Sequence, residues 1–303
     1  MEDFELTLFD RINVIKDTIN KYGEENFYLS FSGGKDSTIL HYLLDMALPN
    51  NRIPRVFIDT GIEYMMIREF VLGLAKSDNR FVIIKPSQPI KPMLEKYGYP
   101  FKSKEHSLRV HDFNNGSTAK YIKKYIEQSG KSRFACPPIL LYQFQERGKY
   151  NYSRQCCYKL KKEPAHKWAK ENKREITITG MRREEGGNRA NIKGCILTDK
   201  KGNVKKFHPL LVVDDEWENW FVNKIEKERK KKILCPLYYD PFNFKRTGCA
   251  GCPYNINLEE DLETMALYLP NQRKQCEFIW EPVYDEYRRL NYRLKRVEKI
   301  KLF

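Results

Sequence analysis

The sequence contains no long uncharged apolar segment. None of its 303 residues belongs to an apolar stretch of the roughly 18 residues that suggest a membrane-spanning helix. The first ten residues, MEDFELTLFD, are acidic and lack the basic and then apolar pattern of a signal peptide. Both absences argue against a membrane partner, and we expect a cytoplasmic protein.

Internal repeats and low-complexity tracts are also absent. What the chain has in excess is positive charge, with 55 Lys and Arg against 40 Asp and Glu and a formal net charge of +15. This excess favours anionic partners such as nucleotides or nucleic acid, although solvated helix surfaces would explain it equally well.

Several short and almost wholly apolar runs alternate with amphipathic helical stretches. The runs are NFYLSFS (26–32), RVFIDT (55–60), FVIIKP (81–86) and EITITG (175–180). Strands of this kind are buried on both faces, and their alternation with helices is typical of a parallel sheet. Right-handed crossovers then predict an α/β, doubly wound, mostly parallel Rossmann-like sheet.

The predicted domain organisation is an α/β domain over residues 1–234 and a cysteine-containing helical extension over 235–303. The segment 98–155 is rich in polar residues, and we expect it to form a lid-like insert in the first domain. The extension begins with a loop rich in proline, glycine and aromatic residues and ends in a long helical pattern.

The sequence SFSGGKDST (30–38) stands where a strand turns into a helix. Gly33 and Gly34 allow a sharp bend and a close approach of the backbone to an anion. The first amides of the helix would then point at phosphate oxygens, assisted by Lys35 and by the hydroxyls of Ser32, Ser37 and Thr38. A carboxylate such as Asp36 at a phosphate site requires a cation, and we expect Mg²⁺ if the nucleotide is ATP.

This loop has neither Walker A nor dinucleotide-fingerprint spacing. It resembles the SGGxDS signature of the PP-loop superfamily, and the segments FIDTGIEY (57–64) and GMRREEGGNRA (180–190) resemble elements of its phosphoadenosine phosphosulfate and adenylyl-sulfate reductases. The resemblance implies an adenine nucleotide site, with Lys35, Asp36 and Arg182 as catalytic candidates. The implied nucleotide-binding residues are Ser32, Gly33, Gly34, Lys35, Asp36, Ser37, Thr38, Asp59, Thr60, Gly61, Gly180 and Arg182.

Four of the eight cysteines stand in two tight pairs, Cys156-Cys157 and Cys249-x-x-Cys252. In a cytoplasmic chain such pairs indicate a metal or cluster site rather than disulfides. The pattern resembles the [4Fe–4S] ligand set of adenylyl-sulfate reductases, which makes these four cysteines the expected ligands. Structural zinc is the alternative.

The resemblance leaves three functions open. The first is reductive release of sulfite from an adenylyl sulfate or its 3′-phosphate form, with Cys276 or an external thiol such as that of thioredoxin attacking sulfur. The segment around Cys276, RKQCEFIW, departs from the family's nucleophile motif. The second is a Mg²⁺-dependent ATP pyrophosphatase that adenylates a nucleic acid for sulfur insertion, and the third is a nucleotide-binding regulator without catalytic activity.

Overall fold

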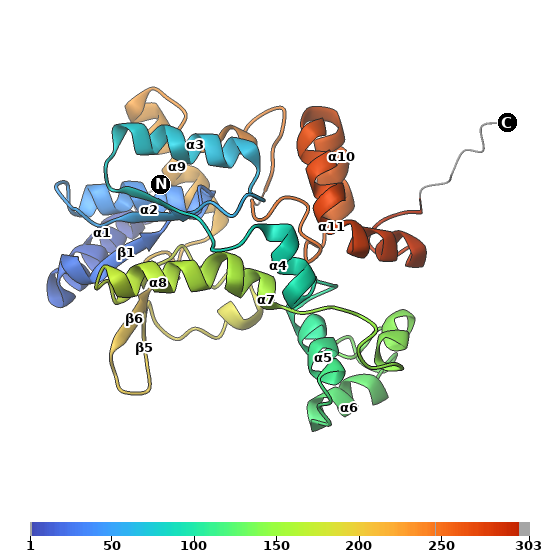
Figure 1. Cartoon of the computed structure of the whole chain (residues 1–303). Coiled ribbons are helices and arrows are strands. Elements are labelled where there is room, and N and C mark those ends of the chain that lie inside the picture. Colours follow the sequence, from blue (N-terminus) through green and yellow to red (C-terminus); the bar gives the residue numbers. More distant parts are fainter. Residues whose placement is uncertain (1, 246, 297–303) are drawn as a thin grey trace. The chain divides into compact units, whose positions relative to one another are not determined.

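The predicted strands form four neighbouring strands of a six-stranded sheet. We describe residues 2–245 and 247–296 of a computed structural model (Figure 1). The four strands are parallel and lie in the order β3-β2-β1-β4. Their bounds are β1 (Phe27–Ser30), β2 (Arg55–Ile58), β3 (Phe81–Ile84) and β4 (Ile176–Ile178). The predicted α/β fold with a mostly parallel sheet is therefore confirmed.

Two short strands that the sequence did not suggest extend the sheet beyond β4. Strand β6 (Val204–Phe207) pairs parallel to β4, and β5 (Ile196–Thr198) pairs antiparallel to β6. Both are only partly buried and carry polar residues, so they lack the continuous apolar character by which the other strands were recognised.

Helices flank the sheet in the pattern that a doubly wound fold requires. Helix α8 (Glu163–Glu171) places Trp168 and Ala169 against Tyr28 of β1 and Val56 of β2. Helix α2 (Lys35–Ala47) contacts β1 and also packs on two other helices. The remaining helices of this group are α1 (Glu2–Tyr22), α3 (Met65–Ser77) and α9 (Asp215–Arg229), with short 3₁₀ turns at Glu24–Asn26, Gly187–Arg189 and Pro236–Tyr238.

The contacts within the chain divide it into two compact units. The first comprises residues 1–59, 63–85 and 163–248 and holds the sheet, and the second comprises 60–62, 86–162 and 249–303. The predicted boundary at residue 235 stays a prediction. No helix within the described residues combines the length and apolarity that crossing a membrane requires.

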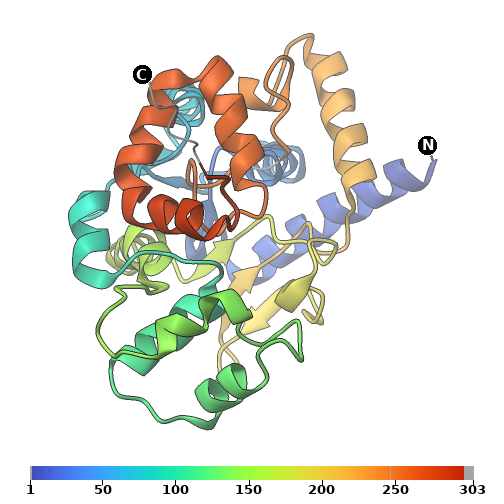
Figure 2. The same ribbon diagram turned by 90° about the vertical axis from the view of Figure 1, so that its right-hand side faces the viewer.

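The second unit is built mainly of helices. Its last two helices, α10 (Leu258–Tyr268) and α11 (Pro270–Leu290), pack side by side (Figure 2). The others are α4 (Ile90–Tyr97), α5 (Lys104–Asn114), α6 (Lys120–Glu127), α7 (Gln155–Cys157), a 3₁₀ segment (Pro138–Phe144) and a π-helical turn (Tyr158–Lys162).

Candidate functional site

The turn from β1 into α2 has the geometry of an anion-binding loop. Gly33 has a φ of +74°, and a Cβ there would lie 2.8 Å from the Cγ2 atom of Ile67, so both its conformation and its surroundings require glycine. Helix α2 begins at Lys35, and its N-cap Gly34 provides no side-chain hydrogen bond. Because the N-cap residue has no side chain that could accept from these amides, the helix end is suited to an anion.

The hydroxyl groups of the loop fix its shape. The Ser37 hydroxyl donates to the Gly34 carbonyl at 3.0 Å, and the Ser32 amide donates to the Ser37 hydroxyl at 3.2 Å. Thr38 also donates its hydroxyl to the Gly34 carbonyl, at 3.0 Å. These bonds hold the backbone of the bend in one conformation before any ligand is bound.

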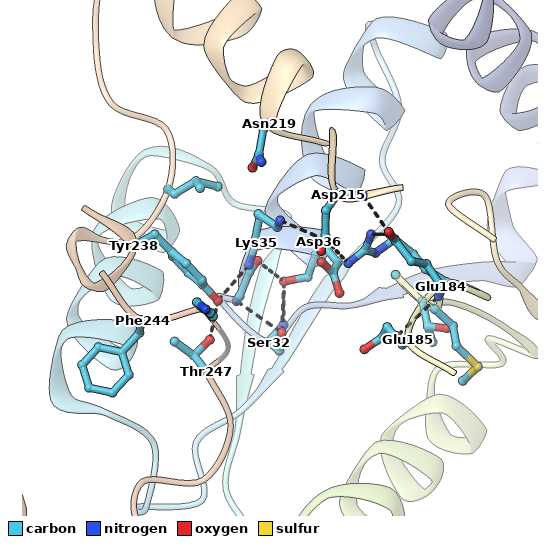
Figure 3. A pocket seen from close by; sticks show the side chains of 18 of the residues that line it. Ser32, Lys35, Asp36, Glu184, Glu185, Asp215, Asn219, Tyr238, Phe244 and Thr247 are labelled. Atoms are coloured by element: carbon cyan, nitrogen blue, oxygen red, sulfur yellow. Dashed lines mark hydrogen bonds and ion pairs between the residues drawn. The ribbon is translucent and has the colours of Figure 1, made fainter. Parts of the chain in front are cut away.

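A cavity of about 800 Å³ opens at this loop and lies within the size range of small-molecule sites. Its walls are the loop, the segment after β4, the start of α9 and the segment 234–247 (Figure 3). Seven predicted nucleotide-binding residues line it, namely Ser32, Gly34, Lys35, Asp36, Ser37, Gly180 and Arg182.

The other predicted residues lie outside this lining. Gly33 forms the bend of the loop, and the Thr38 hydroxyl donates to the Gly34 carbonyl. Asp59 forms an ion pair with the Nε atom of Arg68 at 2.9 Å. Thr60 and Gly61 belong to the second unit, where the Gly61 carbonyl accepts a hydrogen bond from Gln275 at 3.0 Å.

Gly180 allows the end of β4 to approach α2 closely. A Cβ atom at this position would lie 2.6 Å from the Cβ atom of Asp36. Because real Cβ atoms do not come so close, any larger residue would push the strand end and the helix apart. Gly180 thereby determines how near Arg182, two residues on, comes to the phosphate loop.

Carboxylates surround the two main cations of the cavity. Arg182 pairs with Glu184 at 2.8 Å and with Asp215 at 2.6 Å, and its Nε atom lies 3.3 Å from Glu218. The ammonium of Lys35 lies 2.8 Å from Glu218 and 3.6 Å from Asp215. An incoming anion must therefore exchange places with carboxylates that already neutralise these cations.

Sequence reasoning missed Glu218, although a signal for it was present. Glu218 lies on the same face of α9 as Phe221, Val222 and Ile225, which are all buried. An acidic residue at such spacing on an apolar helix face indicates a buried charge with specific partners. Burial, together with the neighbouring Asp36, raises the pKa of Glu218 to about 7, against the opposing effect of Lys35.

Tyr238 and Thr247, also missed, cover the start of α2. The Lys35 amide donates to the Tyr238 hydroxyl at 3.1 Å, and this hydroxyl lies 2.5 Å from that of Thr247 (Figure 3). The tyrosine oxygen thus holds the position at the helix end that a phosphate oxygen would take. Neither residue stands in a pattern that the sequence alone distinguishes from an ordinary loop.

The two cysteine pairs meet within the second unit. The sulfur atoms of Cys156 and Cys157 are 4.0 Å apart. Both Cys249 and Cys252 are close enough to these two thiols to disfavour a negative charge on Cys156. Among the described residues, no three Cys, His, Asp or Glu side chains are arranged as ligands of one metal ion.

The chemistry of the four thiols nevertheless suits a thiolate-bound group. The hydrogen bond from Cys156 and the positive charges of Lys104, Lys161 and Lys162 together lower the pKa of Cys157 to about 6, against the opposing effect of burial. Burial and the neighbouring Cys249 raise the pKa of Cys252 to about 12. A bound cation would remove this mutual repulsion, and nearby lysines would offset the charge of a thiolate cluster.

Side chains of helix α11 donate hydrogen bonds to backbone carbonyls in and directly after the Cys249–Cys252 loop. Trp280 donates to the Ala250 carbonyl at 3.0 Å, Tyr287 donates to the Pro253 carbonyl at 2.9 Å, and Tyr284 donates to the Gly251 carbonyl. These three donors lie along one side of the helix and satisfy two buried carbonyls of the loop and the one directly after it.

Cys276 lies on α11 and has no exposed surface. Its sulfur is 3.9 Å from the sulfur of Met265, and burial raises its pKa to about 12. A thiol in this state is packed and protonated, whereas a nucleophile requires an accessible thiolate.

The fold is α/β, and the loop presents a helix N-terminus at the carboxyl edge of a mostly parallel sheet, a place suited to anionic ligands. The chain belongs to the phosphoadenosine phosphosulfate reductase domain family, whose model matches residues 26–132 and 140–255. The Uncharacterized protein MJ0973 of Methanocaldococcus jannaschii is 23% identical over 282 residues, which are 91% of this chain. The chain spans about half, 53%, of that relative's length.

Several solved structures are similar to the chain at 14% sequence identity. The phosphoadenylyl-sulfate reductase of Candida auris, a phosphate complex, has a TM-score of 0.43 over 78% of this chain and 93% of its own. The FMN adenylyltransferase of Candida glabrata has a TM-score of 0.46 over 82% and 63%. The U34-tRNA thiolase NcsA of Methanococcus maripaludis, with its [4Fe–4S] cluster, has a TM-score of 0.41 over 98% and 84%.

Proposed function

We propose that this chain is an enzyme that binds an adenine nucleotide in the cavity beside Ser32–Ser37 and performs sulfur chemistry on it. The observation that carries the proposal is the helix end at Lys35, where backbone amides, a lysine and Arg182 converge on one cavity. Family membership favours an adenylyl sulfate or its 3′-phosphate form as the nucleotide.

The favoured reaction is the release of sulfite. A thiolate attacks the sulfur atom, the bond from sulfur to the bridging phosphate oxygen breaks, and the adenosine phosphate leaves. A second thiol then attacks the resulting S-sulfonate, so sulfite departs and a disulfide remains. Lys35, Arg182 and the amides of α2 would stabilise the phosphate charge that grows as the bond breaks.

An external thiol fits the first step better than Cys276 does. Cys276 is fully buried in α11 and its pKa is raised, so its reaction would need the helix to open. A thioredoxin-like partner would supply both thiols and would carry the disulfide away.

The carboxylates of the cavity favour a second candidate. Asp36, Glu184 and Asp215 line it together with the cations, an arrangement that suits a nucleotide bound with Mg²⁺. In that case ATP would be split at the α-phosphate, with release of pyrophosphate and transfer of the adenylyl group to a nucleic acid. The net charge of +15 agrees with such an acceptor.

The four paired cysteines would hold a [4Fe–4S] cluster in either reaction, with zinc as the alternative. When bound, such a cluster supplies a positively charged anchor for thiolates and a redox-active centre. The residues that meet this requirement are Cys156, Cys157, Cys249 and Cys252, whose charges interact in the second unit.

The deciding experiment compares the binding of adenylyl sulfate, its 3′-phosphate form and ATP, the last with and without Mg²⁺, by calorimetry. Products are then assayed as sulfite with a dithiol present, and as pyrophosphate with DNA or RNA present. Sulfite release supports the first candidate, and pyrophosphate release supports the second. If none of the three nucleotides binds, the proposed function is wrong.

Replacing Cys276 by serine tests the source of the attacking thiol. Because this thiol is packed and protonated, we expect thiol-dependent sulfite release to stay within about twofold of the unchanged protein. The same assay with a monothiol in place of a dithiol checks that the reductant is external. Complete loss of sulfite release in a folded Cys276→Ser variant would instead identify Cys276 as the nucleophile.

Replacing Tyr238 by phenylalanine removes the hydroxyl that accepts from the Lys35 amide. In the unchanged protein, a nucleotide must displace this hydroxyl before it can bind the Lys35 amide. The variant removes that competition, so we expect nucleotide affinity to rise about three- to tenfold. Tyr239→Phe is the matched control, because the Tyr239 hydroxyl contacts Glu226 on α9 and does not line the cavity. Weaker binding by Tyr238→Phe would mean that the hydroxyl itself contacts the ligand.

A further inference from the structure

Glu218 is buried beneath the cavity and does not line it. Its side chain has no exposed surface, whereas those of Lys35 and Arg182 are 18% and 8% exposed. One carboxylate thus lies 2.8 Å from the ammonium and 3.3 Å from the guanidinium Nε atom. It joins three segments, because Lys35 begins α2, Arg182 follows β4 and Glu218 lies on α9.

The other carboxylates at these cations are placed differently. Asp215 is 62% exposed and Glu184 is 46% exposed. Both can turn into solvent at little cost when a ligand arrives, because exposed ion pairs are weak. The Glu218 side chain has no exposed surface and cannot turn into solvent, so its charge must be compensated by neighbouring groups of the protein.

We propose that Glu218 is a positioning residue that acts as the shared counter-ion of Lys35 and Arg182, and that an anionic nucleotide takes over this role while Glu218 accepts a proton. The inference rests on the proposed function, since it requires an anionic nucleotide in this cavity. Glu218 acts through the two cations and makes no contact with the ligand.

The charges around Glu218 support this exchange. The groups that face it are Lys35 and Asp36 from α2, Arg182 from the segment after β4, and Asp215 on its own helix. Burial and Asp36 together raise the pKa of Glu218 to about 7. A nucleotide anion adds negative charge beside it and raises this pKa further, so binding takes up a proton near neutral pH.

Nucleotide affinity is expected to depend on pH through the charge of Glu218. Above the pKa, Glu218 is charged and competes with the nucleotide for both cations; below it, Glu218 is neutral and the cations are available. Affinity should therefore fall about three- to tenfold as the pH rises from about 6 to about 8. Adenylyl sulfate is the probe, because its phosphosulfate group does not itself titrate in this range.

The test measures adenylyl sulfate binding by calorimetry at both pH values, in buffers of different ionisation enthalpy that report proton uptake. Glu218→Gln should bind with the affinity of the unchanged protein at the lower pH, without pH dependence and without proton uptake. Glu228→Gln is the matched control, because Glu228 lies on the same helix, is 54% exposed and pairs with Lys224 at 3.3 Å. This control should keep the original profile.

Glu218→Asp retains a carboxylate and provides a second variant if the glutamine variant does not fold. It should keep both the falling affinity and the proton uptake. The inference is overturned if Glu218→Gln keeps the original slope, if it binds more weakly at both pH values, or if Glu218→Asp has a flat profile. Absence of any binding by the unchanged protein would overturn the proposed function together with this inference.

Discussion

Lys35→Ala is expected to weaken nucleotide binding by about 100-fold, the equivalent of about 3 kcal/mol for a charge-assisted bond to phosphate. The lysine is the first residue of α2, and its ammonium lies within the group of charges formed by Glu218, Asp215 and Arg182. Its removal deletes one of the two main cations and leaves Arg182 to neutralise Glu218 alone. Calorimetric titration with adenylyl sulfate and with Mg²⁺-ATP measures the loss.

Two controls separate this effect from general damage to the protein. Lys16→Ala removes an exposed lysine from α1, outside the cavity lining, and should leave affinity unchanged. Lys35→Arg retains the charge with a different shape, so we expect partial recovery of binding. Equal affinity of Lys35→Ala and the unchanged protein would contradict the assignment of the phosphate loop.

Loss of the bound metal group is the expected result of replacing Cys157 or Cys252 by serine. A serine hydroxyl is not deprotonated near neutral pH and is a poor ligand for iron or zinc, so one missing thiolate should abolish stable binding. When the proteins are prepared without oxygen, we expect the variants to lack the brown colour, the broad visible absorption and the iron and sulfide of the unchanged protein. If the group is zinc, the unchanged protein is colourless and carries zinc that the variants lack.

Cys235→Ser provides the comparison for these variants. Cys235 is buried in the first unit, apart from the two pairs in sequence, and burial raises its pKa to about 11. Its replacement should leave the metal content unchanged. Full metal content in both Cys157→Ser and Cys252→Ser would show that the paired cysteines are not the ligands.

The four strands β1 to β4 could be predicted because they are almost wholly apolar. The runs at 26–32, 55–60, 81–86 and 175–180 correspond to β1, β2, β3 and β4. Strands β5 and β6 could not be recognised, because β5 is largely exposed and β6 carries two lysines. The two strands join the sheet only where β6 pairs with β4. A sequence pattern reports burial, and these two strands are not fully buried.

The phosphate loop was predictable because its glycines and its lysine are adjacent in sequence. The same adjacency lets them act together on one anion. Asp215, Tyr238 and Thr247 line the cavity, and Glu218 lies beneath it, only because α9 and the segment after it fold back onto the loop. Residues that meet through tertiary contacts leave no spacing to read in one sequence. Only Glu218, an acid on an apolar helix face, carried a local signal.

The aromatic donors of α11 have a consequence for maintenance of the protein. Trp280, Tyr284 and Tyr287 donate to the carbonyls of residues 250, 251 and 253, which lie in and directly after the Cys249–Cys252 loop. The backbone conformation of this loop is therefore fixed by hydrogen bonds to α11 and does not depend on a group bound to its thiols. If the four thiols hold an iron–sulfur cluster as proposed, loss of that cluster to oxygen would leave this loop in place, so reassembly would require new iron and sulfide but no refolding.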